Sequence, residues 1–379
     1  MPISTFDERT LRLTRLDRQG LRQRQDAEVE QVVQRLCALQ SQEPVSPFLA
    51  LWNRIEGFRA QDLEAAYRSG SVVKATMMRM TLHTVAAADY PAFWAAVREG
   101  LRRTRMGDRR LSELGLDPAG LDDLTDELRG LLTTARTSAD MTALLAERCG
   151  NDATAIWWAM RCLLPIHHVP ADGATWAFGR RPRFGYSDRG HYDGDEGTKA
   201  LLLSYLRAFG PAARPDVARF TKLSMTAIRR GLQQLEQAGL VHAVNGPSTP
   251  GLVDVTHAPG SSPDQEIPPR LMTMWDSYVM AYADGSVVPT AYRKVVTRIN
   301  GDQLPTVLVD GKVAGAWRIL NGYVEVTAFE RLATTTWSAL EAEAAALLAF
   351  VSERQAQPWA RFHHWWDKGI PGEDVRRLG

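Results

Sequence analysis

The sequence predicts an α+β protein, mainly α, made of tandem winged-helix modules followed by a small C-terminal β-barrel. Helical patterns followed by β-rich ribbons occur at the start of the chain and again at residues 199–244, which is the outline of a winged helix. Residues 270–330 then change to short runs of strand character, which favour a small barrel or curled sheet. With 379 residues, the chain is long enough for two or three domains or several fused modules.

The first module is predicted to span residues 1–88. Apolar residues recur at helical spacing, and Pro47 is expected in the first turn of one helix, where its missing N–H costs nothing. Residues 72–85 are rich in β-branched and apolar side chains, which predicts two strands, the better one at 78–85. The helices are expected at residues 9–20, 26–40, 48–58 and 62–68.

The second module is predicted at residues 89–190. Its helices are expected at 89–103, 121–132, 139–148 and 156–164. The run 137–140 is typical of a helix start. Residues 169–188 contain glycines, aromatic rings and arginines, which predicts a β wing or loop. Interleaved basic and aromatic residues suit a nucleic-acid backbone, and a packed aromatic corner is an equal alternative.

The third module, residues 191–250, has the clearest local pattern. A polar linker at 191–197 precedes helices expected at 199–209, 214–220 and 225–238, and a strand at 240–244. Ser224 is the expected cap of the last helix. In many winged helices this helix enters the major groove, and here it would present Thr226, Arg229, Arg230 and Gln233. Such helices are also used as buried scaffold.

The fourth region, residues 251–379, contains the predicted barrel. A connector rich in Pro, Gly and Ser occupies 246–269. Strands are expected at 280–283, 287–288, 295–299, 306–309, 312–319 and 323–327. The Asp310-Gly311 pair predicts a hairpin turn between two of them. A closing helix at 338–354 is expected to dock on the barrel.

Composition excludes several classes of protein. No apolar run approaches the roughly 18 to 20 residues that a membrane helix needs, and the first 14 residues are charged, so we expect a cytoplasmic protein without membrane attachment. Three widely spaced cysteines argue against a disulfide framework and a zinc ribbon. The adjacent histidine pairs at 167–168 and 363–364 point in different directions on either regular element. No metal or other cofactor is predicted.

The charge distribution is local rather than global. The net charge is +1, which by itself indicates no nucleic-acid partner. Arginines nevertheless cluster within residues 9–24, 98–110 and 180–189, while 113–127 contains compensating acids. This segregation fits basic surfaces on one face of a neutral body, although solvated helix faces give similar strings.

Two glutamines separated by one residue form the most informative short motif. Helical spacing places Gln40 where its helix ends, and Pro44 and Pro47 prevent continuation. Gln40 and Gln42 are therefore expected on a rigid bend, where each amide can donate and accept hydrogen bonds. Alone, such a triplet is more typical of a solvated helix end.

The surroundings of this motif resemble the AlkZ-like winged-helix DNA glycosylases. The similar blocks lie in the family's order over most of the chain, at residues 39–44, 51–58, 78–85, 205–212, 292–296 and 305–318, with Trp176 and the basic segment after it. The resemblance implies a C-shaped body in which Gln40 and Gln42 are catalytic and lie in a cleft between modules. Ser41 departs from the family, whose middle residue is usually apolar.

The same resemblance implies a substrate. Members act on bulky or crosslinked N7-alkylguanine in double-stranded DNA, in base-excision repair and often in self-resistance to a DNA-alkylating natural product. No obligate protein partner is expected. The residues expected to bind nucleic acid are Arg79, His83, Arg181, Arg183, Arg293, Lys294 and Arg298. A strand histidine such as His83 is more often structural, and the alternative is a donor to a base or phosphate.

The chemistry suits amide side chains. Alkylation at N7 makes the purine cationic, so the base leaves without a general acid, and the protein must position a water and stabilise an oxocarbenium-like sugar. Glu43, beside the motif, is an alternative base or a solvated side chain. Two rival hypotheses remain: a winged-helix DNA-binding regulator, and a non-catalytic protein that binds the drug or its adduct.

Overall fold

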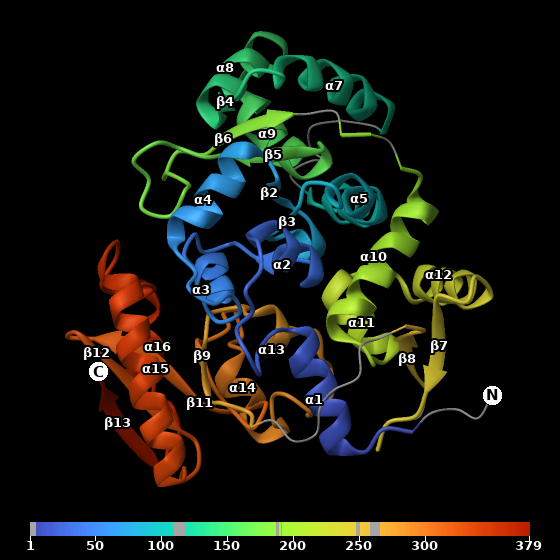
Figure 1. Ribbon diagram of the computed structural model, residues 1–379. Helices are drawn as coiled ribbons and strands as arrows, with labels where there is room; N and C mark the ends of the chain where they lie inside the picture. The colour runs from blue at the N-terminus through green and yellow to red at the C-terminus, as the bar shows by residue number, and fades with distance from the viewer. Residues whose placement is uncertain (1–4, 110–117, 187–188, 191, 248–250, 258–265) are drawn as a thin grey trace.

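The computed structural model describes residues 5–109, 118–186, 189–190, 192–247, 251–257 and 266–379 (Figure 1). It is a mixed α and β protein in which helices predominate, as expected. Within these ranges, no helix is both long enough and apolar enough to cross a lipid bilayer.

A six-stranded antiparallel sheet forms the centre of the first half of the chain. Its strands lie in the order β1-β3-β2-β5-β6-β4. Their bounds are β1 Leu39–Gln40, β2 Val72–Thr76, β3 Leu82–Ala86, β4 Arg136–Thr137, β5 Ile166–Val169 and β6 Arg183–Tyr186. Strand β2 pairs with β3 and also with β5. The predicted modules 1–88 and 89–190 therefore share one continuous sheet.

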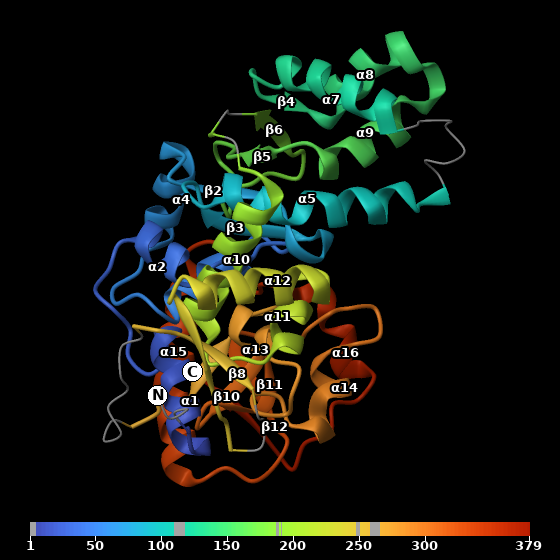
Figure 2. The same ribbon diagram turned by 90° about the vertical axis from the view of Figure 1, so that its right-hand side faces the viewer.

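Most helices of this half of the chain surround the sheet, whereas α1 packs against a later helix at residues 194–209 (Figure 1). Their bounds are α1 Glu8–Arg18, α2 Val29–Arg35, α3 Ser46–Trp52, α4 Ala60–Ser69, α5 Tyr90–Met106, α7 Pro118–Leu131, α8 Ser138–Cys149 and α9 Ala153–Leu163, with 3-10 turns η1 Met78–Met80 and η2 Gly150–Asp152. Two local predictions are confirmed. Pro47 lies in the first turn of α3, and Thr137 caps α8 by accepting a hydrogen bond from the Asp140 backbone N–H at 3.1 Å. Figures 1 and 2 show α7, α8 and α9 together at one end of the molecule.

Two predictions in the first module were wrong. The helix expected at 26–40 ends at Arg35, because Cys37 adopts a left-handed backbone (φ 64°) and the next residues pair with the edge of β3. The strand expected at 78–85 begins only at Leu82, since Arg79 and Met80 also have positive φ and form a 3-10 turn. Strand pairing at the edge of a sheet and left-handed backbone conformations depend on tertiary contacts, which local periodicity does not encode.

Residues 194–255 contain three helices followed by a two-stranded hairpin (Figure 2). The elements are α10 Gly194–Phe209, α11 Arg214–Thr221, α12 Met225–Gln237, β7 Val241–Val244 and β8 Leu252–Val255. Ser224 caps α12 as predicted. The expected linker 191–197 is partly wrong, because the Asp193 carboxylate accepts two backbone hydrogen bonds and α10 begins at Gly194, five residues before the expected start at 199. Gly197 allows α10 to cross α5 closely, since a Cβ there would meet the Ala92 carbonyl oxygen.

The C-terminal sheet has five antiparallel strands in the order β13-β12-β11-β10-β9. The strands are β9 Arg270–Met272, β10 Thr306–Val309, β11 Lys312–Leu320, β12 Tyr323–Ala328 and β13 Asp374–Leu378. Asp310 and Gly311 form the predicted hairpin turn, both with positive φ. The described strands form an open sheet, not a closed barrel. Helix α15 Thr334–Ser352 packs on β9, β12 and β13, as expected for a closing helix.

Three strands predicted between 280 and 299 were wrong. The structure has α13 Ser277–Ala281, η3 Thr290–Tyr292 and α14 Arg293–Val296 in this region, and later η4 Ala360–Phe362 and α16 His364–Asp367. The Asp276 carboxylate caps α13 by accepting a hydrogen bond from the Tyr278 N–H at 2.9 Å. Short β-branched runs are compatible with either state, and here capping and packing favour helix.

A buried ion pair joins the first and last parts of the chain. The Arg54 guanidinium donates to both carboxylate oxygens of Asp276 at 2.9 Å, and the two side chains are 1% and 0% exposed. Arg54 also donates to the backbone oxygens of Gln19 and Ala50 and to the Gln19 side chain. A second buried pair, Arg18 with Asp254, joins α1 to β8.

Removing Arg54 should destabilise the protein strongly. Arg54→Met is expected to lower the free energy of unfolding by about 3–5 kcal/mol, because it leaves the Asp276 carboxylate buried without a cation. Urea denaturation followed by tryptophan fluorescence measures this loss. The control is Arg59→Met, whose side chain is 77% exposed in its pair with Asp62 and should cost less than about 1 kcal/mol. Equal losses in the two variants would contradict the role given to Arg54.

Candidate active site

Gln40 and Gln42 lie at the end of a short edge strand. Gln40 pairs with His83 of β3 and is 5% exposed, whereas Gln42 is exposed on the turn that leads to α3. The Ser41 backbone N–H donates to the Leu82 carbonyl at 2.8 Å. The bend between two packed elements is present as predicted, but a strand and not a helix precedes it.

Backbone hydrogen bonds orient both amides. The Gln40 Oε1 atom accepts from the Gln42 N–H at 2.9 Å, and the Gln42 Oε1 atom accepts from the Leu82 N–H at 3.4 Å. A backbone N–H only donates, so each amide oxygen must face it and each NH2 group must point the other way. Each oxygen keeps a second lone pair. The pair therefore offers both donors and acceptors to a bound molecule.

Ser41 is the middle residue of the motif, and its hydroxyl is fully bonded. Ser41 is 0% exposed and donates to the Leu39 carbonyl at 3.2 Å. Its oxygen lies 2.6 Å from the Thr84 hydroxyl, which also contacts the Tyr67 hydroxyl. Because the one Ser41 proton is used on Leu39, Thr84 donates to Ser41 and Tyr67 donates to Thr84. A polar residue at this position is thus accommodated by a chain of three hydroxyls.

His83 and Arg79 lie together behind Gln40. His83 is 0% exposed, and its Nδ1 atom lies 3.0 Å from the Thr81 carbonyl, which can only accept. Nδ1 therefore holds the proton, and Nε2 accepts from the Arg79 guanidinium at 2.9 Å. Burial and the Arg79 charge lower the pKa of His83 well below 6.5, so the ring is neutral. In this conformation His83 presents no ring nitrogen to DNA.

Arg79 is also engaged with the protein. Its guanidinium donates to the Phe220 carbonyl at 2.6 Å and lies over the Phe220 ring. Burial, and then the charge of Arg219, lower the pKa of Arg79 to about 10. The two residues predicted to bind nucleic acid in this module therefore support β3 and the adjacent turn, and direct contact with DNA stays a prediction.

The other predicted binding residues are divided between two regions. Arg181 and Arg183 are exposed near the start of β6, while Trp176 and Phe184 of the same segment are buried. The segment thus contains the packed aromatic corner that was one alternative, together with an exposed basic edge whose contact with nucleic acid stays a prediction. Trp176 donates to the Gln355 side chain at 2.7 Å.

The second region lies between α13 and β10. Arg293 donates to the carbonyls of Ala283 and Asp284, and Lys294 beside it is exposed. The Arg298 guanidinium lies 4.9 Å from the centre of the Trp365 ring, and burial lowers the pKa of Arg298. No hydrogen bond within the described parts of the chain joins these residues to Gln40 or Gln42.

Charged residues gather beside the motif, and among them the sequence indicated only Glu43. Glu43, with its side chain 13% exposed, forms an ion pair with Arg361. Lys74 lies in β2, is 3% exposed, and pairs across the sheet with Thr84 and His168. A lysine inside an apolar strand was the available signal for Lys74, whereas nothing local to Arg361 indicated its contact.

Burial controls the ionisation of this sheet. It lowers the pKa of Lys74 to about 8, and Glu43 opposes the shift. It also lowers the pKa of His167 to about 4 and that of His168 to about 3, so both rings are neutral at pH 7. Within the described residues, no group of three or more His, Cys, Asp or Glu side chains is placed to hold a metal ion.

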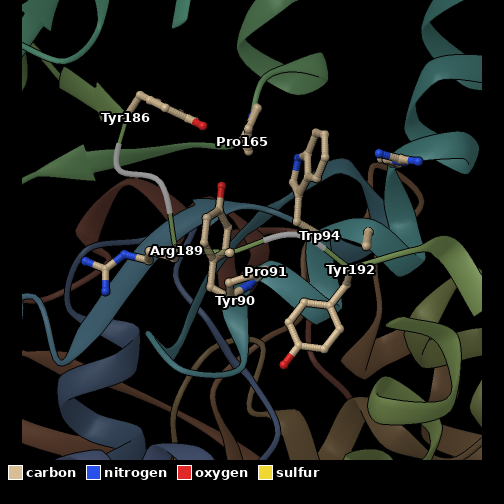
Figure 3. A pocket seen from close by; sticks show the side chains of 10 residues that line it. Tyr90, Pro91, Trp94, Pro165, Tyr186, Arg189 and Tyr192 are labelled. Atoms are coloured by element: carbon tan, nitrogen blue, oxygen red, sulfur yellow. The ribbon is translucent and has the colours of Figure 1, made fainter. Parts of the chain in front are cut away.

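A hollow lies at the start of α5 (Figure 3). It is lined by Tyr90, Pro91, Trp94, Ala95, Arg98, Pro165, Tyr186, Arg189, Gly190 and Tyr192. Its volume is about 40 Å³, which holds one or a few waters and not a nucleobase. Neither glutamine of the motif lines it. The hollow therefore gives no reason to move the candidate site away from Gln40 and Gln42.

Comparison with known proteins gives consistent results. Residues 33–350 match the family described as "DNA glycosylase AlkZ-like". The chain is 26% identical over 368 residues to an interstrand DNA cross-link repair glycosylase of Streptomyces sahachiroi, covering 87% of this chain and 93% of that protein. Its fold is similar to the solved structure of the Streptomyces sahachiroi DNA glycosylase AlkZ, with a TM-score of 0.79 and 21% identity, covering 93% of this chain and 99% of that chain.

The hydroxyl chain predicts an order of stabilities. Thr84→Val should lower the free energy of unfolding by about 1–3 kcal/mol, because the buried Tyr67 hydroxyl loses its acceptor. Tyr67→Phe should cost about 0.5–1.5 kcal/mol, since it leaves no buried donor without an acceptor and Thr84 still donates to Ser41. Chemical denaturation of both variants measures the difference. The assigned direction of the hydroxyl chain is wrong if Tyr67→Phe costs as much as Thr84→Val.

Proposed function

The chain belongs to the AlkZ-like DNA glycosylase family, and from this premise we propose that it hydrolyses the N-glycosidic bond of N7-alkylated guanine in double-stranded DNA. We further propose that it accepts bulky adducts and crosslinked guanines, the latter because the Streptomyces relative is named an interstrand DNA cross-link repair glycosylase. We also propose that it serves base-excision repair and self-resistance to a DNA-alkylating natural product. A DNA substrate implies a cytoplasmic setting.

One observation carries the proposal. Backbone N–H groups hold the oxygens of Gln40 and Gln42, so both amides are oriented before any substrate binds. Groups that are oriented in advance cost little reorganisation during the reaction. A pair of solvated surface glutamines would not be held in this way.

The amides suit a cationic leaving group. N7-alkylguanine departs as a neutral base when the bond from C1′ to N9 breaks, so no acid is needed to protonate it. The remaining lone pair on each amide oxygen can hold a water hydrogen and face the positive charge that develops on the sugar. Amides do not titrate, so this contribution is independent of pH.

DNA would approach through several basic elements. Exposed Arg181, Arg183 and Lys294 are the predicted residues best placed to meet phosphates. Arg293 precedes Lys294 directly, and Arg298 follows it by four residues. His83 and Arg79 contribute by holding the strand beside Gln40. We propose that α10, α11 and α12 with the β7-β8 hairpin are a winged-helix module, and that the six-stranded sheet combines two further wings.

Base release tests this function. Wild type should release base from duplex DNA containing a bulky N7-alkylguanine, scored as alkali-labile abasic sites. Gln40→Ala and Gln42→Ala should each lower the single-turnover rate constant by about 100-fold or more, the scale for losing an oriented group in a transition state. Gln23→Ala, at an exposed glutamine outside the motif, is the matched control and should keep the wild-type rate.

The same experiment separates the rival hypotheses. Undamaged duplex should remain intact, because neutral guanine is a poor leaving group. DNA binding without base release from any adduct would reject the enzymatic proposal and favour a regulator. Tight binding of the alkylating compound itself, again without release, would favour a sequestering protein.

A further inference from the structure

Glu43 is the charged residue nearest in sequence to the two glutamines, and it lies in an unusual environment. It follows Gln42 on the turn between β1 and α3, where its carbonyl accepts from the Ser46 N–H at 3.1 Å and fixes the turn. Its side chain is only 13% exposed. A carboxylate on an exposed turn is normally solvated, so this partial burial requires an explanation.

Two cations from distant parts of the chain face Glu43. Arg361, which is 68% exposed, comes from the C-terminal 3-10 turn and pairs with the Glu43 carboxylate. Lys74 comes from the interior of β2, and its charge and that of Glu43 affect each other. The remaining charged neighbour is Asp302, which accepts a hydrogen bond from the Trp365 indole at 2.9 Å.

Lys74 is the more informative of the two cations. It is 3% exposed, and its ammonium lies 4.6 Å from the centre of the Phe178 ring. Among the residues that the structure describes, none accepts a hydrogen bond from this ammonium. The contact with Phe178 and the negative charge of Glu43 offset the cost of burying this ammonium, so the lysine and the carboxylate favour each other's charged form.

Together these groups set the ionisation of Glu43. Burial raises the pKa of Glu43 above 4.5, and Asp302 adds to the increase, while Arg361 and Lys74 oppose it. The carboxylate is therefore a stronger base than a solvated glutamate, and the two cations favour its charged form. These properties are the ones that a general base needs.

We propose that Glu43 is a third catalytic residue, the general base for the water that Gln40 and Gln42 orient. This inference rests on the proposed glycosylase function. The water oxygen forms a bond to C1′, and the bond from C1′ to N9 breaks with its electron pair moving to the purine. The water proton passes to Glu43. Lys74 and Arg361 are positioning residues, because they hold the carboxylate in its charged form.

A pH profile of single-turnover base release tests the assignment. The wild-type rate constant should fall as pH decreases through the pKa of Glu43, because protonation removes the base. Glu43→Gln should lower the maximal rate constant, the plateau of the pH profile, by about 100-fold or more. It should also abolish the fall in rate at low pH, the acidic limb of the profile, while the Kd for DNA changes less than about threefold. Enzyme-free DNA corrects for acid depurination at each pH.

Arg361→Met provides the second, independent arm. Removing this exposed cation should raise the pKa of Glu43 and move the acidic limb to higher pH, with the plateau largely retained. Lys74→Met should shift the limb in the same direction. Glu8→Gln is the matched control, because Glu8 is an exposed glutamate of α1 that pairs with Lys312. This substitution should leave the pH profile unchanged.

Two results would overturn the proposal. The first is a Glu43→Gln rate constant within about twofold of the wild-type value. The second is an Arg361→Met pH profile whose maximal rate constant falls while its acidic limb stays at the same pH. A purely structural ion pair would behave in this second way. If Glu43→Gln fails to fold, the pH profile of Arg361→Met tests the role of Glu43 by itself. Absence of base release by the wild type would instead reject the proposed function, so the two failures are distinguishable.

Discussion

The buried contact between Arg54 and Asp276 is the interaction on which the arrangement of the site depends. It fastens the end of α3 to the start of α13, although the two residues are 222 positions apart. Asp276 also caps α13, and the next residue, Ser277, donates to the Ala38 carbonyl at 2.7 Å. Ala38 immediately precedes β1. The position of Gln40 is thus tied to the C-terminal half of the chain through a few buried polar contacts.

The C-terminal segment completes the surroundings of the motif. Arg361 reaches Glu43, and Arg354 pairs with Glu64 while donating to the Thr175 carbonyl at 3.0 Å. These contacts join residues 354–361 to Glu43, to α4 and to the segment that contains Trp176. The electrostatics beside the glutamines therefore result from residues near both ends of the sequence, and they exist only when both halves are folded together.

As catalytic groups, neutral amides and a partly buried carboxylate each have a limitation that the other lacks. Neutral amides orient a water without depending on pH, but they are weak bases. A carboxylate is a better base, and burial strengthens it only at the risk of neutralising it. Placing Lys74 and Arg361 around Glu43 resolves this conflict, because each positive charge favours the ionised form. The proposed cationic lesion would need no acid, and His83, the histidine paired with Gln40, is neutral.

The sequence by itself determined the helices and hairpins whose signals are local. Thr137 and Ser224 mark helix starts, Asp310-Gly311 marks a turn, and the glutamine motif with its flanking blocks identifies the family. Only the tertiary structure decided that Leu39–Gln40 is a strand, that His83 is buried and neutral, and that Lys74 and Arg361 flank Glu43. Strand pairing, burial and ion pairs join residues far apart in the chain. Their free energy therefore depends on neighbours that a local pattern does not contain.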